Sequence, residues 1–158
     1  MTIRPQPLTA AAFAPFGDVI ALRPSPDRLI NVGLCGRHHD LAALDFADGR
    51  AGISLFDAEP RRLPLTLDLV ERHPEGSQAF LPMHEHPFLV VVAPDEGGRP
   101  GRPVAFVTDG RQGVNYRRGT WHGVLAPLER GRLFAVVDRI GAGANLEEWV
   151  FDEPYTIV

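Results

Sequence analysis

Four side chains that can bind a metal ion or move a proton lie at or near the ends of segments with the pattern of β-strands. Glu71 and His73 end one alternating segment, Gln78 begins the next, and His122 follows forty-four residues after Gln78. Two imidazoles with carboxylate and amide oxygens suit a borderline divalent ion such as nickel, zinc or iron. The spacing therefore predicts a metal or catalytic centre built from these residues.

The same residues have a plainer interpretation. His73 and His122 would then be hydrogen-bonded strand residues in a barrel that holds no metal. Gln78 is a neutral and weak ligand, so a site that contains it would bind an ion less tightly than one with a glutamate in its place. Both interpretations stay open at the level of spacing.

A second histidine pair, His84 and His86, has the His-x-His form of a metal motif, but its context is different. The positions four and five residues after His86 hold valines, where an acidic ligand would be expected. Pro82 and Pro87 bracket the segment, which favours a loop over a ligand-bearing strand. We expect His84 and His86 to be solvated loop residues.

His38, His39 and Asp40 form another polar group, which is either a structural cluster near the barrel mouth or an edge of the substrate site. Cys35, the only cysteine, precedes them closely. A lone cysteine is usually a small buried apolar residue, so a thiol nucleophile is the weaker interpretation. One cysteine also excludes an internal disulfide, as is usual in a reducing compartment.

The elements that must position these side chains are short strands. Leu65, Leu67 and Leu69 alternate toward one face that Glu71 and His73 continue, like a barrel wall that runs from a packed core into a polar mouth. Turn residues 74–76 then reverse the chain. Further strands are expected at 18–21, 30–34, 53–58, 65–73, 78–81, 88–93, 104–108, 113–117, 132–138 and 147–151. The even spacing of these strands and the lack of helical periodicity predict an all-β antiparallel barrel. We expect it to form a single domain over residues 1–158. One short N-terminal helix is expected from about Ala10 to Pro15, capped by Thr9.

Composition narrows the classes of function. The formal net charge of −4 gives no support for a nucleic-acid or membrane partner. All sixteen basic residues are arginine, which removes lysine Schiff-base chemistry. No Gly-x-Ser-x-Gly elbow or phosphate-binding loop is present. The N-terminal residues lack the apolar core of a signal peptide, and no segment approaches the length of a membrane span, so we expect a cytoplasmic protein.

These motifs, in this order, resemble the ureidoglycolate lyase family of the cupin superfamily, over nearly the whole chain. The layout is that of the two cupin motifs, with Glu71 in the place of the first histidine and Gln78 in the place of the glutamate. The matching blocks are Pro7-Leu8-Thr9, Phe13 to Ile20, Ile30-Asn31, Gly33, His39-Asp40-Leu41, Leu63-Pro64-Leu65, Glu71-Arg72-His73-Pro74, Gly76 to Phe80, Gly113 to Tyr116 and Trp121-His122. Two positions depart from the family pattern: the His84–His86 loop, and Asp57, where the family often carries a basic residue.

The resemblance implies a cupin-type barrel, that is, a double-stranded β-helix or jelly roll, which cleaves (S)-ureidoglycolate to glyoxylate and urea in allantoin breakdown, a part of purine catabolism. It also implies a homodimer and a divalent metal, with a nickel requirement associated with some members. Glu71 would be catalytic, and His73, Gln78 and His122 would be the metal ligands.

An arginine should hold the substrate carboxylate in a bidentate fork. Arg72 is the nearest in sequence, although strand parity points it away from His73. Asn31 and Tyr116 are candidate polar walls of the substrate site.

Two alternatives remain at this point. One is a non-catalytic cupin that binds a small carboxylate metabolite, with Gln78 marking a lost ligand. The other is a differently reactive metal-dependent cupin, such as a dioxygenase or an isomerase.

Overall fold

The computed structural model describes residues 1–158 as fifteen strands and one helical turn, which confirms the predicted all-β class. In chain order the elements are β1 (Thr2–Ile3), β2 (Gln6–Pro7), α1 (Ala10–Phe13), β3 (Gly17–Ile20), β4 (Arg28–Ile30), β5 (Cys35–Arg37), β6 (Arg50–Asp57), β7 (Leu65–Arg72), β8 (Gln78–Pro82), β9 (Phe88–Ala93), β10 (Val104–Val107), β11 (Gly113–Tyr116), β12 (Trp121–His122), β13 (Ala126–Pro127), β14 (Leu133–Ile140) and β15 (Glu147–Ile157). No helix has the length and apolar character needed to cross a membrane.

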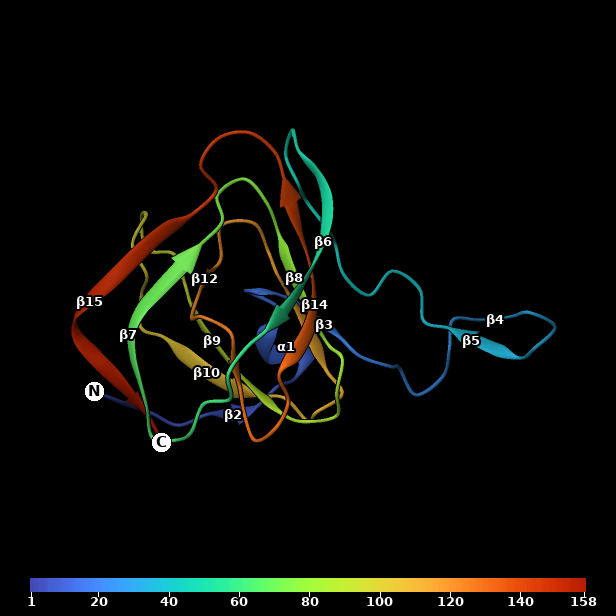
Figure 1. The fold of residues 1–158 in the computed structure, drawn as a ribbon, viewed down its shortest axis with the longest axis horizontal. Coiled ribbons are helices and arrows are strands. Elements are labelled where there is room, and N and C mark those ends of the chain that lie inside the picture. Colours follow the sequence, from blue (N-terminus) through green and yellow to red (C-terminus); the bar gives the residue numbers. More distant parts are fainter.

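Two curled sheets make up the body of the molecule (Figure 1). The eight-stranded sheet has the order β1-β15-β7-β12-β9-β10-β2, with β13 also paired to β9, and the five-stranded sheet has the order β3-β11-β8-β14-β6. Neighbouring strands are antiparallel, as predicted, except that β1 pairs with β15 and β2 with β10 in parallel. Because β1 and β2 are adjacent in sequence yet occupy opposite ends of one sheet, that sheet must curl round on itself.

Strand β9 separates two hydrophobic cores. Phe88, Val90 and Val92 pack into an aromatic core, to which both sheets contribute, and the alternate residues of β9 pack into a second core. All members of the second core belong to strands of the eight-stranded sheet. An unbroken apolar segment such as β9 is what burial on both faces requires.

Helix α1 is short but anchored. The Thr9 side chain accepts a hydrogen bond from the backbone N–H of Ala12 at 3.2 Å, so the predicted cap is confirmed. Phe13 is fully buried in the aromatic core. The helix ends at Phe13, two residues before the predicted end at Pro15.

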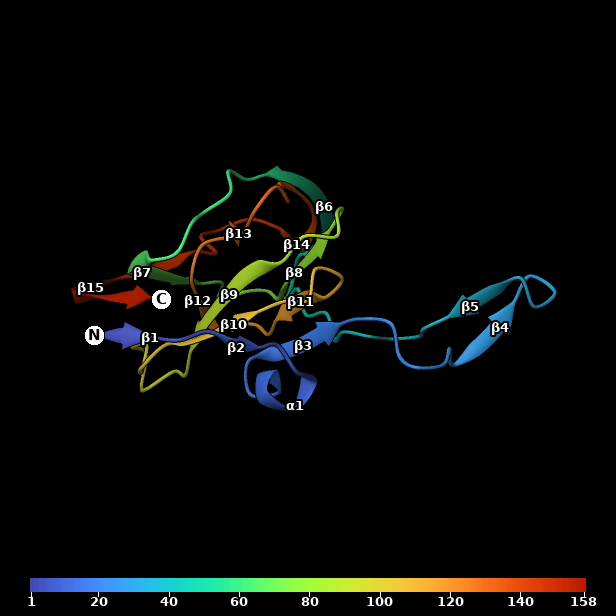
Figure 2. The same cartoon turned by 90° about the horizontal axis from the view of Figure 1, so that it is seen from below.

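The predicted strand at residues 30–34 is wrong. That segment contains the turn of a hairpin in which β4 and β5 pair only with each other. The hairpin projects far from the body in both views (Figures 1 and 2). Cys35 lies on this hairpin and is exposed, which corrects the expectation of a buried cysteine.

The regular alternation predicted along β7 also fails. Leu67 and Val70 pack in the same core, so the phase of the strand shifts by one residue between them. The partner strand β15 is irregular at that point: Val150 pairs with Leu69, and the next paired residue is Tyr155, opposite Leu67. An irregularity of this kind bends a strand and redirects its side chains.

Candidate functional site

The residues singled out by spacing come together where the two sheets meet. Glu71, at the end of β7, lies directly opposite His122 on β12. Gln78 begins β8 and pairs with Tyr116, the last residue of β11. His73 follows β7 in the turn toward β8. We refer to Glu71, His73, Gln78 and His122 as the candidate centre.

The side chains of the candidate centre converge. One ligand atom each from Glu71, His73 and His122 lie within 4.8 Å of one another. The two imidazole rings have centroids 5.3 Å apart, and the Tyr116 ring stacks on His122 at 4.2 Å with an interplanar angle of 1°. This convergence of two strands and a turn is the arrangement that a metal or proton-transfer site needs.

His122 presents a free lone pair. Its Nδ1 lies 3.1 Å from the backbone carbonyl oxygen of Gly123, which only accepts hydrogen bonds, so Nδ1 carries the proton. Its Nε2 is buried and has no hydrogen-bond partner. Burial, reinforced by the neighbouring His73, lowers the pKa of His122 to about 3. At neutral pH the ring is therefore neutral, with an unused basic nitrogen.

His73 is oriented by two oxygens. Its Nδ1 lies 2.7 Å from the backbone carbonyl oxygen of Asn145, and its Nε2 lies 3.2 Å from Oε1 of Gln78. The amide of Gln78 is fixed because its Nε2 donates to Asp138 at 3.3 Å. When Nδ1 donates to Asn145, a lone pair on Nε2 faces the amide oxygen, and two acceptors repel unless a proton or a cation lies between them.

The two acidic groups nearest the imidazoles are both shifted toward their protonated forms. Burial raises the pKa of Glu71; His73 opposes the shift and Glu148 adds to it. Burial, together with the charge of Glu71, also raises the pKa of Tyr116, so its phenol stays neutral at neutral pH. A carboxylate with a raised pKa is a better proton acceptor than an exposed one.

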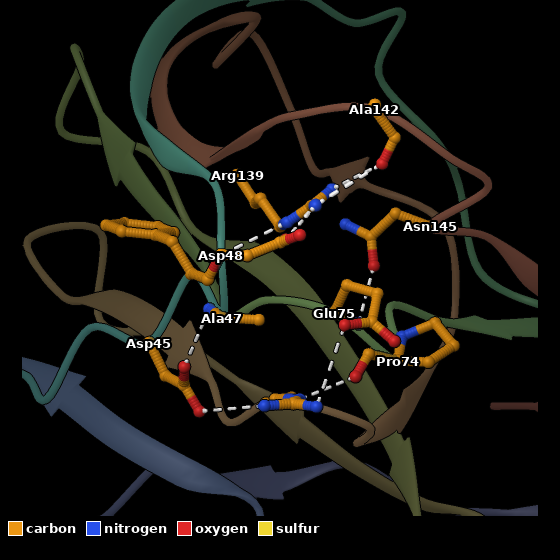
Figure 3. Close-up of polar contacts among 10 residues, drawn as sticks. Asp45, Ala47, Asp48, Pro74, Glu75, Arg139, Ala142 and Asn145 are labelled. Atoms are coloured by element: carbon orange, nitrogen blue, oxygen red, sulfur yellow. Dashed lines mark hydrogen bonds and ion pairs between the residues drawn. The ribbon is translucent and has the colours of Figure 1, made fainter.

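Two arginines connect the loops around this end of the molecule (Figure 3). Arg139, whose side chain is only 4% exposed, donates to Asp48 and to the carbonyl oxygens of Phe46 and Ala142. Arg118 donates to the carbonyl oxygen of Pro74 at 2.6 Å.

Asn145 connects this network to the candidate centre. Its side-chain oxygen accepts from the backbone N–H of Glu75 at 2.7 Å (Figure 3). Its backbone carbonyl oxygen lies 2.7 Å from Nδ1 of His73. The network thus places a hydrogen-bond acceptor behind one of the imidazoles.

Two residues expected to bind substrate lie elsewhere in the chain. Arg72 stacks over the Trp121 ring, 4.4 Å from its centroid, and pairs with Asp95 and Glu147, so it faces away from the candidate centre as strand parity predicted. Asn31 lies at the tip of the projecting hairpin, in a left-handed conformation. One chain by itself therefore does not bring Arg72 or Asn31 to the centre.

The other histidines are separate from the centre. His84 and His86 occupy the loop between β8 and β9, as expected, but His84 is not simply solvated. Its ring packs edge-on against Phe134 at 4.8 Å, its Nε2 is buried, and burial lowers its pKa. His86 pairs with Glu129. A surface hollow of about 710 Å³ beside His86 shares no residue with the centre.

His38 and His39 lie at the base of the hairpin. Nδ1 of His38 accepts from the backbone N–H of Arg23, and the backbone N–H of His39 donates to Asp27. These contacts are consistent with the structural interpretation of the cluster.

Sequence reasoning missed Asp138, Arg139 and Asn145. Asp138 is the last residue of the predicted strand 132–138, Arg139 lies just beyond it although β14 continues to Ile140, and Asn145 lies in a loop rich in glycine and alanine. Asn145 acts on His73 through a backbone carbonyl, and every residue has one. No pattern of side chains could have identified it.

Comparisons with known proteins agree over the full length. The family model described as ureidoglycolate lyase matches residues 1–158. The chain is 64% identical over 153 residues to the ureidoglycolate lyase of Rhodobacter capsulatus, covering 96% of this chain and 95% of that protein. It is 52% identical to ureidoglycolate lyase 2 of Rhizobium meliloti and 54% identical to the ureidoglycolate lyase of Chelativorans sp., in each case over 154 residues, covering 96% of this chain and 94% and 93% of the two relatives.

Proposed function

The chain belongs to the ureidoglycolate lyase family and cleaves ureidoglycolate, and we propose that the reaction takes place at the candidate centre. The observation that carries this assignment is the convergence of ligand atoms from Glu71, His73 and His122 within 4.8 Å. The (S)-isomer is the proposed substrate, and glyoxylate and urea are the proposed products.

The chemistry requires a base and an acid at one carbon. Ureidoglycolate is an anionic hemiaminal, with a hydroxyl group and a urea nitrogen on the same carbon. Removing the hydroxyl proton lets the oxygen form the aldehyde of glyoxylate while the carbon–nitrogen bond breaks. The electron pair of that bond leaves with the urea nitrogen, which takes up one proton. One proton is removed from the hydroxyl and one is added to the urea nitrogen, so the reaction needs no other reactant.

Glu71 is the proposed proton carrier. Its raised pKa, caused by burial, suits a carboxylate that takes a proton from the hydroxyl and returns it to the urea nitrogen. Tyr116, a neutral phenol stacked on His122, remains the proposed polar wall. Arg72 and Asn31 are left out of this proposal, because in one chain they lie outside the centre.

His73, Gln78 and His122 fit a divalent metal. Nε2 of His122 is a buried lone pair without a partner, and Nε2 of His73 and Oε1 of Gln78 are acceptors that face each other. A borderline ion such as Ni²⁺ matches this mixed set of nitrogen and oxygen donors. When bound, such an ion would supply a Lewis acid that lowers the pKa of the substrate hydroxyl.

The remaining parts of the proposal rest on the family resemblance. We assign the two curled sheets to the cupin-type jelly roll, in a single domain over residues 1–158. We further propose that the protein works as a homodimer in allantoin degradation. The comparisons do not favour the alternative of a non-catalytic or differently reactive cupin.

The test is a product assay with purified protein. Incubation with (S)-ureidoglycolate should release urea and glyoxylate in equal amounts, and Glu71→Gln should lower kcat by about 100-fold or more while circular dichroism shows an unchanged fold. Binding of ureidoglycolate without turnover, even with added divalent metals, would support the non-catalytic cupin instead. Wild-type turnover by Glu71→Gln would remove the assigned base.

A further inference from the structure

A cationic hollow lies at the surface beside the loop between β8 and β9, away from the candidate centre. Its volume is about 710 Å³, which is within the range of small-molecule sites. No hydrophobic side chain lines it. Most small-molecule sites are largely apolar, so a lining of this kind suits a ligand that is itself polar and charged. The lining residues are Pro60, Arg61, Arg62, His86, Glu129 and Arg130.

The three arginines of the hollow are free to bind an anion. None of the guanidinium groups of Arg61, Arg62 and Arg130 forms an ion pair or a hydrogen bond within the chain, whereas nearby acidic groups are already engaged. Glu59 pairs with Arg132 at 2.8 Å. Glu129 pairs with the His86 ring at 3.1 Å. Unpaired cations in one hollow repel each other, and a bound anion would replace that repulsion with attraction.

Backbone hydrogen bonds hold the segments of the hollow in a fixed relation. The N–H of Arg61 donates to the carbonyl oxygen of Pro127 at 2.7 Å, and the N–H of Leu128 donates to the carbonyl oxygen of Pro87 at 3.0 Å. Strand β13, which ends at Pro127, pairs in turn with β9. A ligand therefore does not have to order these segments when it binds, and the entropy lost on binding is smaller.

The number of guanidinium groups favours phosphate over carboxylate as the ligand chemistry. A carboxylate has only two oxygens, and a single guanidinium fork engages both of them. A phosphate group presents more oxygens in a tetrahedral arrangement, so several guanidinium groups can converge on one small ligand. The net charge of the chain is −4, and no extended basic surface continues from the hollow to follow a nucleic acid.

We propose that this hollow binds a small oligophosphate, an anion with two or three linked phosphate groups. Arg61, Arg62 and Arg130 are the proposed contacts. Glu129 also lines the hollow, and its charge opposes the ligand. The site therefore responds to substitution in both directions: removal of an arginine weakens binding, and neutralisation of Glu129 strengthens it.

Calorimetric titration of the full-length protein with inorganic tripolyphosphate tests the proposal. We expect one ion to bind per wild-type chain, and Arg62→Gln combined with Arg130→Gln should raise Kd at least about tenfold. The matched control, Arg99→Gln with Arg102→Gln, removes the same charge outside the hollow and should keep Kd within about twofold. Glu129→Gln retains an oxygen that can face His86 and should lower Kd by about threefold.

The comparison separates a built site from general charge. All the variants keep the residues of the candidate centre, so any competition of the probe for an ion bound there is the same in each protein. An equal rise of Kd in both double variants, or no binding to the wild type, would overturn the proposal.

Citrate tests the choice of phosphate chemistry. This tricarboxylate should bind the wild type at least about tenfold more weakly than tripolyphosphate, and equal affinity would overturn the assignment to oligophosphates. Because the hollow shares no residue with the candidate centre, the site can fail these tests while the proposed lyase reaction stands.

Discussion

His122 combines full burial with a basic nitrogen that no group of the chain uses. Its pKa of about 3 lies below the ordinary value of 6.5 because burial disfavours the charged ring. A buried histidine that stays neutral can offer its lone pair to a metal or to a substrate proton throughout the neutral range. The same property gives the folded state a dependence on pH.

The stability of the metal-free protein should fall in acid because of His122. Between about pH 3 and pH 6.5 the unfolded chain binds a proton that the folded chain does not. The free energy of unfolding contributed by this group is therefore complete above pH 6.5 and decreases as the pH falls toward 3, by up to about 1.4 kcal/mol per pH unit. Glu71, whose raised pKa acts in the opposite direction, moderates the slope. Urea unfolding at a series of pH values, with a chelator present, measures this. The free energy of unfolding should change less with pH for His122→Gln than for the wild type. An equal dependence on pH in the two proteins would contradict a depressed pKa at His122.

The two loop histidines provide a contrast. We expect His86→Ala to leave kcat/KM within about twofold of the wild type, because the His86 ring pairs with Glu129 at the surface, away from the candidate centre. His84→Ala should also keep full activity but lower the free energy of unfolding by about 1–2 kcal/mol, since its ring packs on Phe134. Steady-state kinetics and urea denaturation test both. A severe loss of activity in either variant would make His84 and His86 candidate metal ligands.

At this scale the sequence was informative for only part of the site. The spacing of Glu71, His73, Gln78 and His122 predicted four side chains that do lie together, because a tight turn and a neighbouring strand fix their relation. Asn31 could not be placed, because its position depends on how a loop leaves the body. Asn145 was invisible because it acts through a carbonyl group.

Arg139 shows how loops around the site depend on one buried side chain. A Cβ atom on Gly49, Gly76 or Gly141 would lie within 2.6–2.7 Å of its side chain, so the arginine occupies a sleeve walled by glycine. Its guanidinium holds Ala142 of the loop from which Asn145 contacts His73. We expect the loop to lose its position when the guanidinium is removed.

Arg139→Ala should lower both stability and turnover. Loss of a buried, charged donor costs about 2–4 kcal/mol, and kcat should fall together with it because His73 is no longer held. Guanidinium ion at low concentration should restore part of kcat by entering the sleeve. Arg118→Ala is the control, because Arg118 is 41% exposed and should cost less than about 1 kcal/mol. Undiminished kcat in Arg139→Ala, or no response to guanidinium, would limit Arg139 to a structural role.

The predicted strand boundaries agree with the observed ones where burial along the strand is regular, and the predictions fail where a strand bends. The predicted segments at 88–93 and 78–81 correspond closely to β9 and β8. The predicted β7 alternation failed at the irregularity opposite Val150, which depends on pairing with a strand some eighty residues away. Such long-range pairing leaves no signal in the local pattern.

For the molecule as a whole, the N-terminal segment closes the eight-stranded sheet. Ile3 on β1 is buried in the second core, and β2 pairs at the other end of the same sheet. Ile3→Ala should therefore lower the free energy of unfolding by about 2 kcal/mol or more, although β1 has only two residues. Urea denaturation measures this, with the exposed Val124→Ala as the control. An effect no greater than that of the control would show that the closure contributes little.

Strand content and the all-β class were predictable from the sequence, whereas the curl of the eight-stranded sheet and the projecting β4–β5 hairpin were not. Turn residues between apolar segments indicate strands locally. The curl depends on the complete fold, because β1 pairs with β15 at one end of the sheet and β2 pairs with β10 at the other. The β4–β5 hairpin pairs with neither main sheet, and no local pattern of residues indicates that it leaves the body of the molecule.

The most direct test of the proposed centre is metal content measured together with lyase turnover, on protein purified without a histidine tag. The wild type should contain about one divalent ion per chain and release urea and glyoxylate in equal amounts. His73→Ala and His122→Ala should each lose the ion and lower kcat/KM by about 100-fold or more while remaining folded. Wild-type turnover in either variant would contradict the central claim that ureidoglycolate is cleaved at these two imidazoles.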